Sequence, residues 1–183
     1  RAQELAVKAP AMPEDVRWHF IGHLQTNKVR QIMPHVSLIH SIDSIRLLRI
    51  VDSEAARIGR TVDVLLQVHV AREETKFGFT PDELLAELPA QWQPADTSSV
   101  RVRGVMGMAS LTDDNSRIAA DFSEIARVFR ELREGLFAGV ATFDTISMGM
   151  SDDFGIAIDA GSTMVRIGTD LSLIHISEPT RPY

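Results

Sequence analysis

Residues 62–70 have the sequence Val-Asp-Val-Leu-Leu-Gln-Val-His-Val and contain the strongest strand pattern in the chain. β-Branched side chains favour a strand. A run that is apolar on both faces is typical of a parallel sheet covered by helices. Five further apolar runs are expected to be strands of the same sheet, at residues 18–24, 37–43, 100–108, 143–148 and 164–168.

Segments with helical patterns separate these strands. The clearest one covers residues 116–136, where Ile118, Phe122 and Phe129 belong to a set of apolar side chains spaced three and four residues apart. We expect the other helices at residues 1–8, 27–33, 44–58, 81–88 and 153–160.

Two helix starts carry capping signals. Asp43 or Ser44 precedes the third expected helix, and either side chain can accept a hydrogen bond from its first turn. At the next helix, Thr80 and Glu83 have the spacing of a capping box, in which each side chain accepts from the other residue's backbone N–H.

Six strands alternating with helices predict an α/β protein with a parallel sheet. The alternation alone fits either an open doubly wound sheet or a closed barrel. No G-x-G-x-x-G follows the first strand, which argues against a dinucleotide-binding unit. Six strands are too few for a (β/α)8 TIM barrel, so either the sheet is open or two strands of a barrel are missing.

The composition limits the class of protein. The 183 residues suit one domain, and 44% hydrophobic and 24% charged residues are typical of a globular protein. A net charge of -6 gives no general attraction to nucleic acid or to an anionic membrane. The absence of cysteine excludes disulfides and thiolate metal sites and fits a reducing cytoplasm. No apolar run approaches the roughly 20 residues that span a bilayer.

Two loops near the C-terminus have the composition of an anion site. Residues 147–151, Ser-Met-Gly-Met-Ser, follow a strand and precede a short helix, and residues 166–169 are Arg-Ile-Gly-Thr. In both candidate folds ligands bind where the strands end, and helix N-termini favour anions. One interpretation is a phosphate site that includes the Arg166 cation. The alternative is that Gly149 and Gly168 only turn the chain and that Arg166 pairs with a carboxylate.

The histidines on or beside the expected strands are His19, His23, His40 and His69. They lack a tight ligand spacing such as H-x-x-x-H, so a metal site is not expected. His19 and His40 fit equally well as core residues whose ring nitrogens are hydrogen-bonded.

Six motifs follow one another along the chain. They are Trp-His-Phe-Ile-Gly-His-Leu-Gln-Thr-Asn-Lys at 18–28, His-Ser-Ile-Asp at 40–43, Glu-Thr-Lys-Phe-Gly at 74–78, Arg-Gly-Val-Met at 103–106, Ser-Met-Gly-Met-Ser-Asp at 147–152 and Val-Arg-Ile-Gly-Thr at 165–169. In their residues and their order they resemble the YggS/PROSC family, and the resemblance runs from residue 1 to about residue 169. The resemblance implies a (β/α)8 TIM barrel like the N-terminal domain of alanine racemase. It also implies that the barrel binds pyridoxal 5′-phosphate (PLP).

The resemblance also implies which residues hold PLP. The residues expected on the phosphate are Ser147, Gly168 and Thr169, with Ser151 nearby. Arg166 is expected at the phosphate or at the pyridine nitrogen, where it would weaken the electron sink of the ring. The residues expected to line the rest of the pocket are Asn27, Lys76 and Met106. His69 stands where the family more often has asparagine.

The chain departs from the family pattern at its start. The family's Schiff-base lysine lies in an A-V-S-K segment on a first strand, and a second strand ends near G-E-N-R. Arg1 resembles that last arginine, so we expect the barrel to be incomplete, without its first two strands and the end of its last. Lys8, Lys28 and Lys76 lie in other contexts, and no catalytic residue is assigned.

The C-terminal residues depart from the family as well. From Asp170 onward the sequence resembles a translated sequencing adaptor. We therefore divide the chain into a partial PLP-binding domain at residues 1–169 and a non-native tail at residues 170–183.

Three functions follow from these observations. The first is a cytoplasmic PLP carrier in PLP homeostasis, without an established catalysed reaction and monomeric or weakly dimeric when intact. Its partner is the small-molecule cofactor, not nucleic acid or a membrane. The second is an amino-acid racemase, which needs a second acid/base, whereas the only tyrosine is Tyr183 in the tail. The third is a non-functional fragment with open sheet edges.

Overall fold

The computed structural model describes residues 1–71 and 77–168 and contains one parallel sheet. The strands follow their order in the chain from one edge to the other. Their bounds are β1 Trp18–Phe20, β2 Val36–Ile42, β3 Val62–Gln67, β4 Val100–Met106, β5 Thr145–Met150 and β6 Met164–Arg166.

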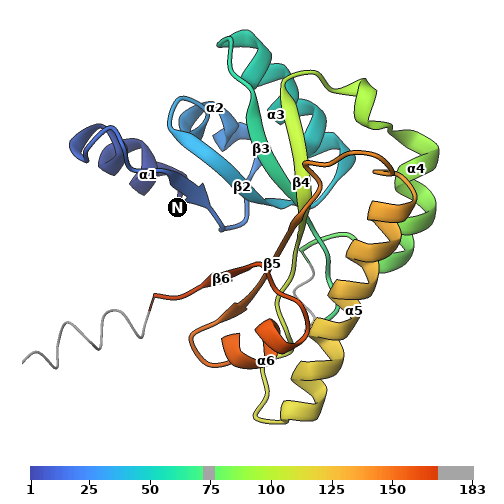
Figure 1. Cartoon of the computed structure of the whole chain (residues 1–183). Coiled ribbons are helices and arrows are strands. Elements are labelled where there is room, and N and C mark those ends of the chain that lie inside the picture. Colours follow the sequence, from blue (N-terminus) through green and yellow to red (C-terminus); the bar gives the residue numbers. More distant parts are fainter. Residues whose placement is uncertain (72–76, 169–183) are drawn as a thin grey trace, which may run out of the picture.

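This strand order decides between the two candidate sheets. A doubly wound sheet reverses its strand order at a switch point, where its ligand binds. Here each strand pairs with the one before it and the order never reverses, which is how a barrel winds. Figure 1 shows the sheet curling, with the edge strands β1 and β6 on the same side of the molecule.

The helices cover the convex side of the curl, where α4 and α5 lie on the right of Figure 1. Their bounds are α1 Ala2–Lys8, α2 Val29–Ile32, α3 Ile45–Arg57, α4 Leu88–Gln91, α5 Asn115–Glu134 and α6 Phe154–Asp159. Short 3-10 segments lie at Ala9–Ala11, Thr26–Lys28 and Pro94–Asp96, and a π-helical segment lies at Glu83–Glu87. No helix in the described ranges is both long and apolar enough to span a membrane.

The capping signals are confirmed. Ser44, rather than Asp43, caps α3, because its side chain accepts a hydrogen bond from the N–H of Leu47 at 3.1 Å. Thr80 and Glu83 form both bonds of a capping box, at 2.7 and 3.2 Å.

Several expected boundaries were wrong. The strand expected at 18–24 ends at Phe20, and the helix expected at 27–33 is a 3-10 turn followed by one α-turn. The helix expected at 81–88 extends to Gln91 and becomes π-helical, with the N–H of Leu88 bonded to the carbonyl of Glu83. Pro89 has no N–H to continue the regular ladder, which accounts for a change of hydrogen-bond register there.

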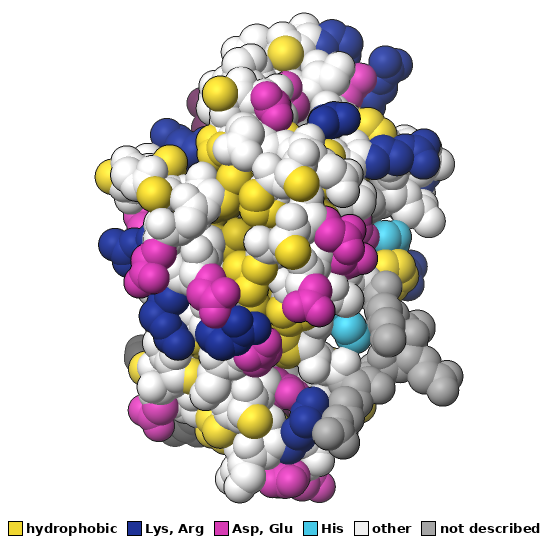
Figure 2. Space-filling model, turned by 90° about the vertical axis from the view of Figure 1, so that its right-hand side faces the viewer, with side chains coloured by type: hydrophobic (Ala, Val, Ile, Leu, Met, Phe, Trp, Pro, Cys, Tyr) yellow, Lys and Arg dark blue, Asp and Glu magenta, His cyan; other side chains and the backbone are white. Residues whose placement is uncertain are grey.

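The two faces of the sheet are packed differently. A large apolar core lies between the sheet and the helices. The concave face carries a small apolar layer of Leu38, Leu65 and Met106, contacted by Met164. The inside of the curl also carries polar side chains, and these form the candidate site. On the helical side, Figure 2 shows acidic and basic side chains interspersed around a narrow hydrophobic strip.

Candidate functional site

A chain of hydrogen bonds crosses the concave face from β1 to β6. His19 Nδ1 lies 3.1 Å from His40 Nε2, and His40 Nδ1 lies 2.9 Å from Ser147 Oγ. Arg166 Nη1 donates to Ser147 Oγ at 2.6 Å, and Arg166 Nη2 donates to the carbonyl of Gly107 at 3.2 Å. The curl of the sheet therefore brings together side chains from four strands.

Arg166 is a desolvated cation without a carboxylate partner. It forms no ion pair with any residue of the described ranges, and burial lowers the pKa of its guanidinium, which the charge of Asp153 partly offsets. The expected alternative, that Arg166 pairs with a carboxylate, is therefore wrong for this part of the chain. A buried cation is costly unless it has a counter-ion. The position fits an anionic ligand, such as a phosphate group.

The turn from β5 to α6 needs its glycine. Gly149 has a φ of 98°, and a Cβ there would lie 2.7 Å from the Cβ of Ala157. The N–H of Met150 donates to the carboxylate of Asp153 at 2.7 Å. The N–H of Asp153 is occupied as well, since it donates to the Met150 carbonyl at 3.1 Å, so the Ser151 hydroxyl is the side-chain donor that this turn offers to an anion. Ser151 is half-buried.

The structure brings only some of the expected ligands together. Ser147 and Arg166 are hydrogen-bonded, and Met106 is the strand partner of Ser147 on β4. Asn27 is exposed on the turn after β1, and no hydrogen bond within the described ranges joins it to this cluster. Gly168 is exposed just after β6. Lys76 and Thr169 lie outside the described residues.

The histidine expectations are confirmed in part. His40 is 1% exposed and both its ring nitrogens have partners, as expected of a core residue. His19 is exposed, because β1 is an edge strand, so a core position was the wrong expectation. The signal that identifies His40 as a site residue is the alternation of side chains along residues 36–42, which places Leu38 and His40 on one face of the sheet and was not used to predict the site.

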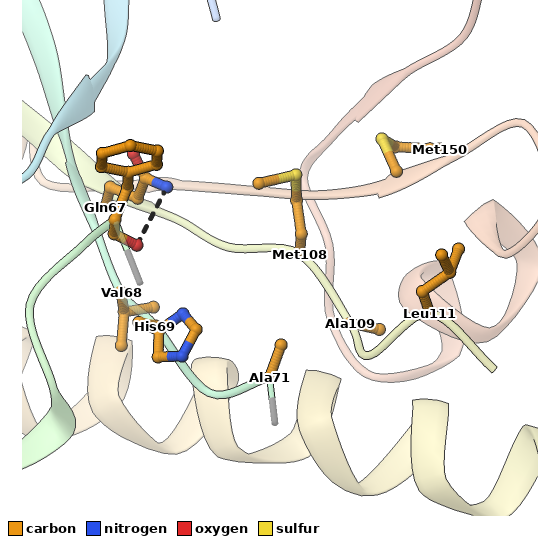
Figure 3. A pocket seen from close by; sticks show the side chains of 9 residues that line it. Gln67, Val68, His69, Ala71, Met108, Ala109, Leu111 and Met150 are labelled. Carbon is orange, nitrogen blue, oxygen red and sulfur yellow. Dashed lines mark hydrogen bonds between the residues drawn. The ribbon is translucent and has the colours of Figure 1, made fainter. Parts of the chain in front are cut away.

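A cavity of about 290 Å³ opens at the ends of β3, β4 and β5, and the described residues that line it do not include the hydrogen-bonded cluster. Its walls include His69, Met108 and Met150, which surround the cavity in Figure 3. The Nε2 atom of His69 is buried and has no hydrogen-bond partner among residues 1–71 and 77–168. The volume is at the lower end of the range for small-molecule sites.

The neutral state of His40 predicts a dependence of stability on pH. Burial first, then His19 and Arg166, lower the pKa of His40 to about 3 from 6.5. Below pH 6.5 His40 is therefore protonated in the unfolded chain but stays neutral in the folded chain. The free energy of unfolding consequently falls as the pH drops towards 3. Between pH 7 and pH 5 we expect His40 to remove about 2 kcal/mol from the free energy of unfolding.

Urea denaturation at both pH values checks this expectation, with His40→Asn as the control. The substituted chain should lose less stability over the same interval, since Asn does not titrate. Equal losses in the two chains would contradict a lowered pKa at His40.

Residues 1–175 match the family described as "Alanine racemase, N-terminal domain", and the chain belongs to this family. Within it, the pyridoxal phosphate homeostasis protein of Aquifex aeolicus is 38% identical over 177 residues, which are 92% of this chain and 72% of that protein. The protein of the same name from Pasteurella multocida is 34% identical over 154 residues, which cover 84% of this chain. The chain spans 64% of the length of the Pasteurella relative.

Solved structures agree with the barrel. PipY of Synechococcus elongatus, solved without PLP, superposes with a TM-score of 0.85 at 34% identity and covers 93% of this chain and 78% of PipY. PipY with PLP bound superposes with a TM-score of 0.81 at 33% identity over the same shares. The resemblance to the YggS/PROSC family is confirmed, and the six strands belong to an incomplete (β/α)8 TIM barrel.

Proposed function

We propose that this chain is the larger part of a PLP-binding protein that acts in PLP homeostasis. In this role it carries or buffers the cofactor and so influences amino-acid and keto-acid balance, without catalysing a reaction of its own. The single observation that carries the proposal is the half-buried Arg166, which has hydrogen-bond acceptors but no carboxylate within ion-pair distance in the described ranges. The names of the relatives and the PLP-bound PipY structure support the same cofactor.

The residues present fit the phosphate end of PLP. The proposed ligands are Ser151, Arg166, Gly168 and Thr169, with Ser147 holding Arg166 through its buried hydroxyl and Asn27 and Met106 towards the rest of the pocket. PLP supplies an aldehyde that condenses with amines and a ring that withdraws electrons. Of the two places expected for Arg166, we propose the phosphate rather than the pyridine nitrogen, because a phosphate supplies the counter-ion that the guanidinium lacks.

The described part of the chain offers no lysine beside Arg166. Lys8 lies on α1 next to Glu4, and Lys28 lies in the turn before α2. Because neither lysine lies beside Arg166, we propose that this chain binds PLP non-covalently. We also propose that residues 1–169 form the PLP-binding domain and that residues 170–183 are a non-native tail. We further propose that the intact protein works in the cytoplasm as a monomer or weak dimer, without nucleic-acid or membrane partners.

Titration of the chain with PLP and with pyridoxal, followed by absorbance and intrinsic fluorescence, tests the proposal. PLP should bind at least about tenfold more tightly than pyridoxal, because charge-assisted hydrogen bonds contribute about 1.5–3 kcal/mol and only PLP can form them with Arg166. Equal affinities would show that no phosphate site exists. Circular dichroism of the same samples separates that result from a failure of the chain to fold.

A further inference from the structure

The concave face buries a polar pair in apolar surroundings. His40 is 1% exposed and Ser147 is fully buried, close to the layer formed by Leu38, Leu65 and Met106. Burying polar side chains costs free energy unless their donors and acceptors are paired. The donors and acceptors of His40 and Ser147 must therefore be paired. This requirement identifies which atom donates in each hydrogen bond of the cluster.

The direction of the hydrogen bonds starts from Arg166. A guanidinium can only donate, so Ser147 Oγ and the Gly107 carbonyl both accept from it. The Ser147 hydroxyl keeps one hydrogen, which points to Nδ1 of His40 when that nitrogen carries no proton. His40 then has its proton on Nε2 and donates it to Nδ1 of His19.

Only a neutral His40 satisfies this arrangement. A doubly protonated ring would present a second donor and a positive charge to the side of the site that already holds Arg166. The groups that face His40 are His19 from β1, Ser147 from β5 and, beyond Ser147, Arg166 from β6. The pKa of His40 is lowered by burial first and then by His19 and Arg166, in agreement with the geometry.

We propose that His40 is a positioning residue for Arg166: it orients the Ser147 hydroxyl, which in turn fixes one edge of the guanidinium at the ends of β5 and β6. The Gly107 carbonyl fixes the other edge. His40 does not itself contact the ligand. The positioning role rests on the proposed function in one respect: the ligand that Arg166 binds is taken to be PLP.

Two substitutions separate this role from a general packing role. Asparagine carries its amide where imidazole has Nδ1, so His40→Asn keeps a partner for Ser147. Glutamine carries its amide near the position of Nε2, so His40→Gln keeps a partner for His19 and leaves Ser147 without one. Both substitutions bury an amide of similar polarity, and both chains are compared with the unsubstituted chain.

The first measurement is the PLP dissociation constant of the three chains, with folding checked by circular dichroism. We expect His40→Asn to bind within about threefold of the unsubstituted chain and His40→Gln to bind about tenfold more weakly, the effect of about one hydrogen bond. If His40→Gln binds as tightly as the unsubstituted chain, or if His40→Asn binds as weakly as His40→Gln, the positioning role is overturned while the proposed function stands.

The second measurement needs no ligand. ¹⁵N NMR of the arginine side chains should show slow rotation of the Arg166 guanidinium in the unsubstituted and His40→Asn chains, and faster rotation in His40→Gln. Equal rotation in all three chains overturns the inference. If the unsubstituted chain binds no PLP, the proposed function fails, and the NMR result alone decides the role of His40.

Discussion

Arg166→Met should weaken PLP binding by about 30-fold to 100-fold, the loss that corresponds to about 2–3 kcal/mol of charge-assisted hydrogen bonding. The guanidinium is the desolvated cation at the ends of β5 and β6, and methionine replaces its length without its charge. Arg166→Lys should give an intermediate affinity, because an ammonium keeps the charge but not the two-sided contact with Ser147 and Gly107.

The stability of the Arg166→Met chain shows whether Arg166 binds the ligand or stabilises the fold. Arg166 is half-buried and partly desolvated, so removing its charge should leave the free energy of unfolding of the unliganded chain unchanged or higher. Arg101→Met is the matched control, since Arg101 is exposed on β4 and pairs with Asp63. It should leave PLP affinity unchanged. A loss of affinity in both variants would mean that arginine at position 166 has no special role.

Gly104→Ala should unfold the chain or cost at least about 4 kcal/mol of stability, the sum of a steric overlap and a strained backbone. Gly104 has a φ of 152° and faces Thr145 on β5, and a Cβ there would overlap the Thr145 carbonyl oxygen. The overlap involves backbone on both sides, so no side-chain rotation can relieve it. β4 and β5 would have to separate, and Ser147 would leave its place beside Met106.

Chemical denaturation followed by circular dichroism measures this effect, and Gly139→Ala provides the control. Gly139 also has a positive φ, 76°, but a Cβ there would meet no atom within 4 Å. Gly139→Ala should lower the free energy of unfolding by only about 1 kcal/mol, because glycine adopts a positive φ more readily than alanine does. If both substitutions lower the free energy of unfolding by similar amounts, the close approach of β4 and β5 is not the reason that position 104 needs glycine.

Local sequence patterns predicted the elements well, because each pattern depends on residues that are neighbours in the chain. The apolar run at 62–70 and the spacing within 116–136 identified β3 and α5. The order of the strands in the sheet could not be derived in this way, because hydrophobic periodicity does not specify which strands pair. The π-helical segment before Pro89 depended on a single missing N–H, which a hydrophobic pattern does not register.

The candidate site was predictable where its residues follow strand ends. Ser147 and Arg166 were expected together because their loops are adjacent in a barrel, and the structure joins them. The link from Ser147 to His40 was not expected, since it spans 107 residues and depends on the curvature of the sheet. Asn27 was assigned from the resemblance alone, and its exposed position in the structure gives no support from geometry.

The unreversed strand order has a consequence for how the protein is made. Every strand of the described sheet after β1 has the strand made just before it as a neighbour, so its partner is already present when it is synthesised. His40 on β2 is in place early, Ser147 on β5 joins it later, and Arg166 on β6 is added last. Among the described strands, β6 is therefore the one whose pairing completes the Arg166 site, so anion binding through Arg166 should appear only once β6 has joined the sheet.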